Sequence, residues 1–386
     1  MKYKILFLFL FVIGLCSSNA ALALSAAFVK PKNGLFSTYE ITNFQLKAPL
    51  TTLFKAKKLN FFEVKKVKVN GVISYTDEKQ NLVNLNVELY IKGYTTTQFC
   101  TFPKLELKIP KSESIGTIFD GIKTVDLNTH CVEQDDPSTE AYIQYIKSSF
   151  NNHREAMIYR IMDVLNMPSL RARPVLIQYT DTDENSEVSA KPNFAYQAFF
   201  LEDYSDFRKK NNLKAIRGVN DVTKADVDVN DTDKLSTYVF SNVADSPNMD
   251  LDDAARSAVL QFIIGNGDWF LQTTKTDLRE EGHSDGENLW NMKIVEDTKG
   301  KWITIPQDFN FSMFMQNYPV VQPINSKVFD LASTESKINI LEGFTNKKSQ
   351  IYEIIKQLDG SGPIIYRLEL VFAEIERMLS NLKITK

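Results

Sequence analysis

The hydrophobic pattern changes along this chain from a two-residue period to a three- to four-residue period, and that order most constrains its fold. From Phe36 to Pro110 the pattern is strand-like, and Leu82 to Ile91 alternates before a Lys-Gly turn. Further strands are predicted from Leu105 to Ile109 and from Ile122 to Leu127. Short connections between these segments predict antiparallel, hairpin-connected strands.

In the rest of the chain the apolar residues recur mostly at helical spacing, with two predicted strands between the helices. The pattern predicts a helix within Thr139 to Met167, strands at Val175 to Tyr179 and Phe194 to Leu201, and a helix at Leu251 to Ile264. Two or three closing helices are predicted between Phe329 and Leu382. This order of elements predicts an α+β fold with a strand-rich part first and a helix-rich part second.

Composition excludes several classes of protein. The 386 residues are 43% hydrophobic and 24% charged, which is typical of a folded globular chain and unlike a disordered or collagenous one. The net charge of −3 gives no indication of a nucleic-acid partner. Three histidines and three cysteines, with no CxxC spacing, argue against a zinc site.

The first residues predict export. Lys2 and Lys4 precede an apolar run from Ile5 to Leu15, and small residues follow, so residues 1–20 are expected to be a signal peptide. A lipid anchor on Cys16 is disfavoured, because Leu15 stands where a small residue is required. The mature chain is expected in the periplasm or outside the cell, with no transmembrane segment.

Two cysteines, Cys100 and Cys131, remain after removal of the signal peptide. In an oxidising compartment they are expected to form a disulfide that closes a loop of about 30 residues. The alternative is two buried free thiols.

Three polar residues stand where the chain turns sharply or a strand ends. Asp268 lies in the turn Gly265-Asn266-Gly267-Asp268-Trp269 directly after an apolar helix, and Asp308 follows the apolar segment Trp302 to Pro306. Asn291 lies between them in the sequence. Together they would supply one base and two oxygen ligands, the set that phosphoryl transfer from a magnesium nucleotide requires. The alternative is that the two acids only cap a helix end and a turn.

The same segments resemble the hallmarks of a bacterial family of exported proteins related to the CotH spore-coat kinases. Those hallmarks are an Asn-x-Asp-Trp turn, an Asn-x-Lys strand start and a Pro-x-Asp-Phe-Asp-Phe-Ser segment. The matching segments are Gly265 to Trp269, Asn291 to Lys293, Pro306 to Ser312 and, upstream, Cys100 to Leu105, Arg154 to Arg160 and Phe199 to Asp203. One departure is Asn310, where the family has a second acid.

The resemblance implies a two-lobed protein-kinase-like fold. An antiparallel, β-rich N-terminal lobe with one long helix would span residues 21–201, and a helix-rich C-terminal lobe would span residues 202–386. By resemblance, ATP and Mg²⁺ would be the cofactors. Asp268 would be the catalytic carboxylate, Asn291 and Asp308 would hold the metal, and Asn310 would offer a further oxygen.

The resemblance also implies a set of residues around the nucleotide. Glu155 would pair with a lysine that binds phosphate. Lys123 is the first choice for that lysine because it is in phase with the apolar residues of its strand, and Lys108 is the second. Lys92 would begin a loop over the phosphates, and Phe199 to Glu202 would be the hinge whose backbone contacts the adenine.

These features predict an exported, magnesium-nucleotide-dependent phosphotransferase acting on a hydroxyl of a protein or of the cell envelope. The alternative is a catalytically silent protein of kinase fold that binds an envelope polymer or a protein partner. Stabilisation by a magnesium nucleotide would distinguish the two.

Overall fold

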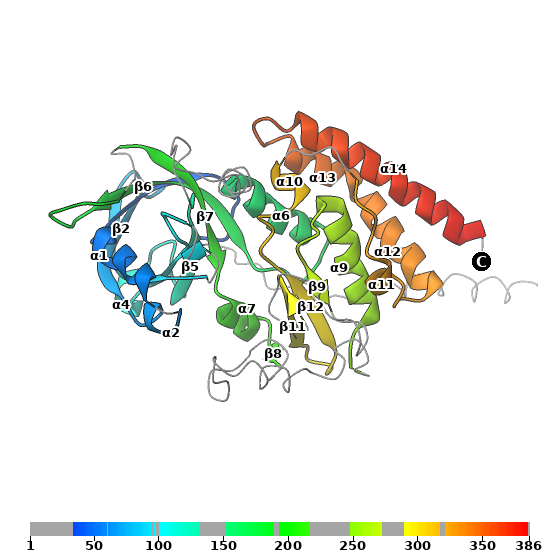
Figure 1. Cartoon of the computed structure of the whole chain (residues 1–386), viewed down its shortest axis with the longest axis horizontal. Coiled ribbons are helices and arrows are strands. Elements are labelled where there is room, and N and C mark those ends of the chain that lie inside the picture. Colours follow the sequence, from blue (N-terminus) through cyan, green and yellow to red (C-terminus); the bar gives the residue numbers. More distant parts are fainter. Residues whose placement is uncertain are drawn as a thin grey trace, which may run out of the picture.

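A β-barrel and a helix-rich part lie side by side in the computed structural model (Figure 1). The structure describes residues 34–59, 61–93, 96–97, 100–131, 151–188, 193–216, 248–271, 289–316 and 321–384. The expected signal peptide and the first part of the helix predicted from Thr139 lie outside these residues.

The barrel contains seven strands within the described residues. They are β1 (Thr42–Ala48), β2 (Val69–Thr76), β3 (Leu82–Ile91), β4 (Leu105–Lys108), β5 (Thr124–Asn128), β6 (Ala172–Asp181) and β7 (Ala195–Glu202). Their order around the barrel is β1-β2-β3-β4-β5-β7-β6. The ladders from β2 to β5 are antiparallel as predicted, whereas β6 closes the barrel by pairing in parallel with β1.

The closed barrel contradicts the predicted fold class. A two-lobed protein-kinase-like fold was expected to begin with an antiparallel β-rich lobe, but the first sheet has no open edge and contains a parallel pair of strands. The physical reason is a long-range pairing, in which Thr42 of β1 lies opposite Val175 of β6. Hydrophobic periodicity reports which residues form strands but not which strands pair across more than a hundred residues.

Strand alternation separates the barrel core from the core of the helical part. In β1, Phe44, Leu46 and Ala48 point into the barrel. In β7, Phe200 packs inside the barrel while its neighbour Phe199 points outward and joins the core of the helical part. The helical part therefore packs on the outer face of β7 and on the neighbouring start of β6, where Ala172 joins the same core.

Short helices cover the barrel and lead away from it. They are α1 (Leu50–Lys55), the 3₁₀ helix η1 (Ala56–Lys58), α2 (Phe61–Val64), α4 (Lys111–Ser114) and α7 (Tyr204–Lys210). The carboxylate of Asp181, at the end of β6, accepts hydrogen bonds from the backbone N–H groups of Leu50 and Thr51 and holds the first turn of α1.

The predicted disulfide is confirmed. Cys100 and Cys131 are bonded, with their Cα atoms 4.6 Å apart. Beside the bond, Phe102 N–H donates to the carbonyl oxygen of Cys131 at 2.7 Å, which fixes the entry into β4. A stable disulfide belongs to oxidising compartments, which agrees with export. Over the part of the chain that the structure describes, no helix is long and apolar enough to span a bilayer.

The helical part is built on α6 (Asn152–Val164) and α9 (Leu251–Ile264). The bounds of α9 are those predicted. The other elements are β8 (Lys214–Ala215), β9 (Phe270–Leu271), β10 (Leu289–Trp290), β11 (Met292–Glu296), β12 (Trp302–Pro306), α10 (Met313–Gln316), α11 (Ser326–Phe329), α12 (Thr334–Asn346), α13 (Lys348–Ile355) and α14 (Gly362–Ile384). The last three helices confirm the predicted closing helices.

Both ends of α9 are fixed by polar contacts. The Asp250 side chain caps the first turn, and Gly265 ends the helix with φ at 63°, a left-handed conformation that glycine adopts readily. Asp253, in the first turn, accepts hydrogen bonds from Thr304 N–H and Thr304 Oγ1, both at 2.6 Å. These bonds join α9 to β12 and so set the helix against the hairpin that ends near Asp308.

Candidate functional site

The turn after α9 presents Asp268 to the start of the β11–β12 hairpin. Asn266 Oδ1 accepts from Asp268 N–H at 3.0 Å, and Asn266 Nδ2 donates to Gln261 Oε1 at 2.9 Å. On the other side, Asn291 Nδ2 donates to Asp268 Oδ2 at 2.9 Å. The two residues predicted as base and metal ligand are therefore in direct contact.

Asn291 and Asp308 stand at the open end of the hairpin. Met292 lies opposite Pro306, and Gln307 N–H donates to the carbonyl oxygen of Asn291 at 3.0 Å. Both Asn291 and Asp308 have left-handed backbones, with φ of 50° and 57°. Asn and Asp tolerate this region better than other non-glycine residues, and such conformations cluster at functional sites. The structure thus brings Asp268, Asn291 and Asp308 to one place.

Lys104 of the barrel reaches across to this hairpin. Its ammonium lies 3.2 Å from Asp308 Oδ1, and its side chain is only 15% exposed. Lys104 lies four residues after Cys100 and directly precedes β4. The Cys100–Cys131 disulfide and the backbone pairing of Phe102 with Cys131 therefore fix the position of its backbone. The Lys104–Asp308 ion pair joins the barrel to the helical part.

Helix α6 adds two side chains on one face, four residues apart. Glu155 Oε1 accepts from Phe309 N–H at 3.4 Å, and Tyr159 Oη accepts from Asp308 N–H at 3.4 Å. The Tyr159 ring packs against Phe309, with ring centroids 5.2 Å apart. Asp308 and its neighbour are therefore held by the same helix that carries the predicted partner of the phosphate-binding lysine.

The charges of this cluster perturb one another. Burial, with a smaller contribution from the nearby Asp308, raises the pKa of Glu155 to about 7 against the opposing charge of Lys104. Burial alone would lower the pKa of Lys104, but the charges of Asp308 and Glu155 outweigh it and raise that pKa. Lys104 is thus a stable cation beside two acids, and such perturbed groups are typical of functional sites.

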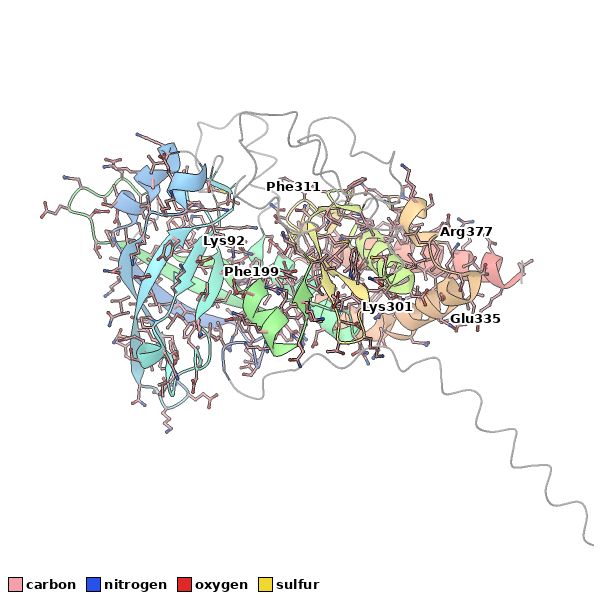
Figure 2. The ribbon with its side chains drawn as sticks, turned by 90° about the horizontal axis from the view of Figure 1, so that it is seen from below. Lys92, Phe199, Lys301, Phe311, Glu335 and Arg377 are labelled. Carbon is pink, nitrogen blue, oxygen red and sulfur yellow. A yellow bond between two sulfur atoms is a disulfide. The ribbon has the colours of Figure 1, made fainter. Side chains whose placement is uncertain are left out.

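A second ion pair adjoins the first on the barrel. Lys92 Nζ lies 2.6 Å from Asp126 Oδ2, and Glu106 is 3.8 Å away. Burial raises the pKa of Asp126 to about 6, although Lys92 opposes the shift. Lys92 and Phe199 lie on the side of the barrel nearest the helical part (Figure 2). Asp126 also contributes to the raised pKa of Lys104, so the two pairs share one electrostatic environment.

The structure places neither of the predicted phosphate-binding lysines in this cluster. Lys123 is exposed just before β5, and Lys108 is exposed on β4 with its ammonium 4.1 Å from the centre of the Tyr90 ring. The phase argument for Lys123 assumed that the apolar face of β5 borders the site. In the closed barrel, Val125 and Leu127 point inward, and the outward residue between them is Asp126.

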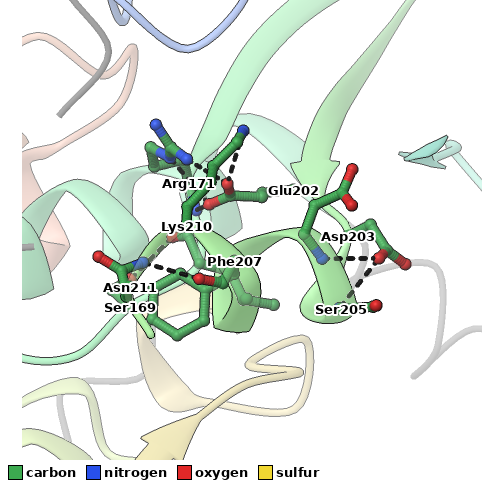
Figure 3. Close-up of polar contacts among 10 residues, drawn as sticks. Ser169, Arg171, Glu202, Asp203, Ser205, Phe207, Lys210 and Asn211 are labelled. Carbon is green, nitrogen blue, oxygen red and sulfur yellow. Dashed lines mark hydrogen bonds and ion pairs between the residues drawn. The ribbon is translucent and has the colours of Figure 1, made fainter. Parts of the chain in front are cut away.

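Glu202 lies apart from the cluster, at the end of β7. Figure 3 shows its carboxylate between Arg171 and Lys210, with Asp203 capping α7. Arg171 Nε donates to Glu202 Oε2 at 2.8 Å, and Lys210 Nζ is 3.4 Å from Oε1. The side chain of Glu202 is therefore already neutralised by protein groups, and its backbone N–H donates to the carbonyl oxygen of Arg171 at 2.8 Å. The contact of this segment with adenine stays a prediction.

The candidate ligands for a cation at the hairpin end are one carboxylate, Asp308, and the amide oxygens of Asn291 and Asn310. Within the described ranges, no group of three or more His, Cys, Asp or Glu side chains is arranged to hold a metal ion. Asn310, however, is only 5% exposed, and its Oδ1 atom has no hydrogen-bond partner among the described residues. Mg²⁺ usually takes one or two carboxylates, with substrate phosphates and water completing its shell. Asp308, Asn291 and Asn310 fit that pattern.

The raised pKa of Glu155 predicts a specific pH dependence of stability. The native state holds this proton more tightly than the unfolded chain, so the stabilisation is complete below pH 4.5 and is lost as the pH rises through about 7. Between about pH 5 and about pH 8, this effect is expected to lower the free energy of unfolding of the wild type by roughly 2–3 kcal/mol. Glu155→Gln, whose side chain stays neutral, is expected not to show this decrease. Urea unfolding at both pH values measures this.

The matched control for this prediction is Glu335→Gln, an exposed glutamate in the first turn of α12. It is expected to follow the wild-type pH dependence. If Glu155→Gln and the wild type lose equal stability over the same interval, the buried proton on Glu155 is ruled out.

Comparison with known proteins leaves the family of the chain open. No known protein family matches its sequence, and no curated protein matches it. Among solved structures, the chain is similar to Fam20 of hydra, in a structure with sugar, at 10% sequence identity and a TM-score of 0.37. The similarity covers 91% of this chain and 87% of that one. At this level it establishes neither a common fold nor a common activity, so membership of the CotH-like family stays a prediction.

Proposed function

We propose that the cluster around Asp308 binds a magnesium nucleotide and transfers its terminal phosphoryl group to a hydroxyl of a protein or of the cell envelope. The observation that carries this proposal is the position of Lys104, a largely buried cation that pairs with Asp308 and feels the charge of Glu155, at the hairpin end where Asn291 contacts Asp268. A cation for phosphate, oxygens for a metal and a carboxylate for a hydroxyl are the parts that phosphoryl transfer needs.

Each side chain has a distinct part in this proposal. Asp308 would hold the metal with the oxygens of Asn291 and Asn310, while Lys104 would leave Asp308 and bind a phosphate oxygen. Glu155 would then lose its proton and pair with Lys104. Asp268 would orient the acceptor hydroxyl and accept its proton. The bound metal would neutralise charge on the phosphates.

Two local features support these assignments. The Asn291 amide nitrogen is committed to Asp268, so the carbonyl oxygen of the same side chain is the atom left for a cation. The buried and unpaired Oδ1 of Asn310 is a site that an ordered water or a cation would satisfy. Export to the periplasm or the cell exterior, as the disulfide suggests, would make the acceptor an extracytoplasmic one.

Thermal unfolding tests the proposal. A magnesium nucleotide at 100 times its dissociation constant is expected to stabilise the protein by about 2.7 kcal/mol, seen as a rise in Tm. ATP with EDTA is expected to give a much smaller rise. Lys104→Met is expected to lose the effect of the magnesium nucleotide.

The control is Lys337→Met, because Lys337 is equally buried and also pairs with an aspartate, 2.7 Å away. This variant is expected to respond like the wild type. The absence of any magnesium-dependent rise in the wild-type protein would contradict the proposal and favour a protein that binds an envelope polymer or a partner without catalysis.

A further inference from the structure

The closing helix α14 inserts one charged side chain into the core beneath the Asp268 turn. Arg367 is only 1% exposed and is among the largest side chains that the described part of the chain buries completely. Burial lowers its pKa to about 10, which still leaves the guanidinium charged at neutral pH. A buried charge is costly, so the contacts that it makes need an explanation.

Two of those contacts are hydrogen bonds to the last turn of α9. Arg367 Nη2 donates to the carbonyl oxygen of Phe262 at 3.1 Å, and Nη1 donates to that of Ile263. The carbonyls at a helix C-terminus lack partners within the helix and carry partial negative charge, so a cation suits this position. A side chain at Gly265 would collide with the guanidinium, which therefore lies directly against the residue that ends the helix.

The same helix end is connected to Asp268 by an unbroken series of hydrogen bonds. Gly265 N–H donates to Phe262, and Asn266 N–H donates to the carbonyl oxygen of Gln261. Asn266 then binds the Gln261 side chain and accepts from Asp268 N–H. Residues 261–268 thus form one hydrogen-bonded unit whose carbonyl side rests on Arg367.

We infer that Arg367 is a positioning residue: by holding the last turn of α9, α14 sets the place of the Asp268 carboxylate. The effect on catalysis rests on the proposed phosphoryl transfer, whereas the effect on the turn does not. A carboxylate displaced by about 1 Å can cost ~10²-fold in rate without loss of substrate binding. Arg367 is not one of the residues proposed to bind the nucleotide or the acceptor and would act through α9.

Hydrogen exchange and kinetics of Arg367→Lys test this inference. Lysine keeps the charge but lacks the planar guanidinium, whose two terminal nitrogens bind the two carbonyl oxygens in a fixed geometry. We expect the amides of residues 265–268 to exchange at least ~10-fold faster relative to the rest of the protein. We also expect kcat to fall by ~10²-fold while the KM for the magnesium nucleotide stays within a few-fold.

Two controls on the same helix separate positioning from general stability. Leu368→Ala removes a fully buried neighbour, and Arg377→Lys makes the same substitution at an exposed arginine. Leu368→Ala is expected to lower the Tm with little effect on kcat or on the relative exchange of the turn. Arg377→Lys is expected to behave like the wild type.

Unchanged relative exchange of the turn in Arg367→Lys overturns the inference. The inference is also overturned if kcat falls in proportion to the decrease in Tm in both Arg367→Lys and Leu368→Ala. If the wild type transfers no phosphate, the exchange result alone decides. If Arg367→Lys does not fold, hydrogen exchange of the wild type tests the inference instead. The inference then predicts that the amides of the turn and the α14 amides around Arg367 exchange through one common opening. Exchange of the turn at a lower opening free energy than that of the α14 amides refutes it.

Discussion

Asp308→Asn is expected to weaken the binding of a magnesium nucleotide by about 10²-fold or more. The variant removes the carboxylate proposed to hold the metal, and Asn tolerates the left-handed backbone at this position, with φ of 57°. Without magnesium, ATP is expected to bind the variant at least as well as the wild type, because a negative charge has been removed near the phosphates. Calorimetric titration with and without Mg²⁺ measures both affinities.

The fold is expected to survive this substitution. Asp308 raises the pKa of Glu155, so its removal lets Glu155 ionise and replace it as the partner of Lys104. Asp330→Asn is the matched control, because Asp330 also pairs with a largely buried lysine at 2.7 Å. Equal losses of nucleotide affinity in the two variants, or a loss that does not depend on Mg²⁺, would exclude Asp308 as the metal ligand.

Asp268→Asn is expected to reduce phosphoryl transfer by ~10²-fold or more while nucleotide affinity stays within a few-fold. The proposed work of Asp268 concerns the acceptor hydroxyl and not the bound nucleotide. An asparagine can turn its carbonyl oxygen toward Asn291 Nδ2, which keeps the 2.9 Å contact of the wild type. Transfer of labelled phosphate to protein and envelope fractions measures the rate.

Asp297→Asn is the control for this substitution. Asp297 is likewise an aspartate in a turn whose carboxylate accepts hydrogen bonds, there from the backbone N–H groups of Lys299 and Lys301, but that turn lies at the other end of the β11–β12 hairpin. It is expected to keep full transfer. Wild-type rates in Asp268→Asn would remove the proposed base from the mechanism.

Local elements of this fold were predictable because their signals are local. The bounds of α9 and β3 follow from periodicity and from the residues at their ends, such as Asp250 before α9 and Gly265 after it. Local rules also placed Asp268, Asn291 and Asp308 each at a helix or strand end, whereas the resemblance, and not the spacing, implied that these ends meet.

Closure of the barrel was not predictable in the same way. The strand β1 alternates buried and exposed residues from Phe44 to Ala48, but nothing in that pattern specifies β6 as its neighbour. The missed pairing also explains why Lys123 was expected to border the cluster around Asp308. With an open sheet, the apolar phase of β5 would border the site, whereas in a barrel that phase lines the interior.

The sequence contains a weak indication of where the backbone of Lys104 lies, but none of where its side chain points. Lys104 follows Cys100 by four residues, so the predicted disulfide placed it on a tethered segment at the end of a strand. Its direction depends on the bridge between Phe102 and Cys131 and on the tertiary contact with Asp308, neither of which has a sequence period.

A structure of the protein with Mn²⁺ in place of Mg²⁺ and a non-hydrolysable ATP analogue tests the central claim most directly. The proposal predicts an anomalous peak for the metal beside Asp308, within bonding distance of its carboxylate and of Asn291, with Lys104 moved onto a phosphate and Asp268 facing the terminal phosphoryl group. A nucleotide bound elsewhere, or a metal away from Asp308 with the Lys104–Asp308 pair intact, would contradict it.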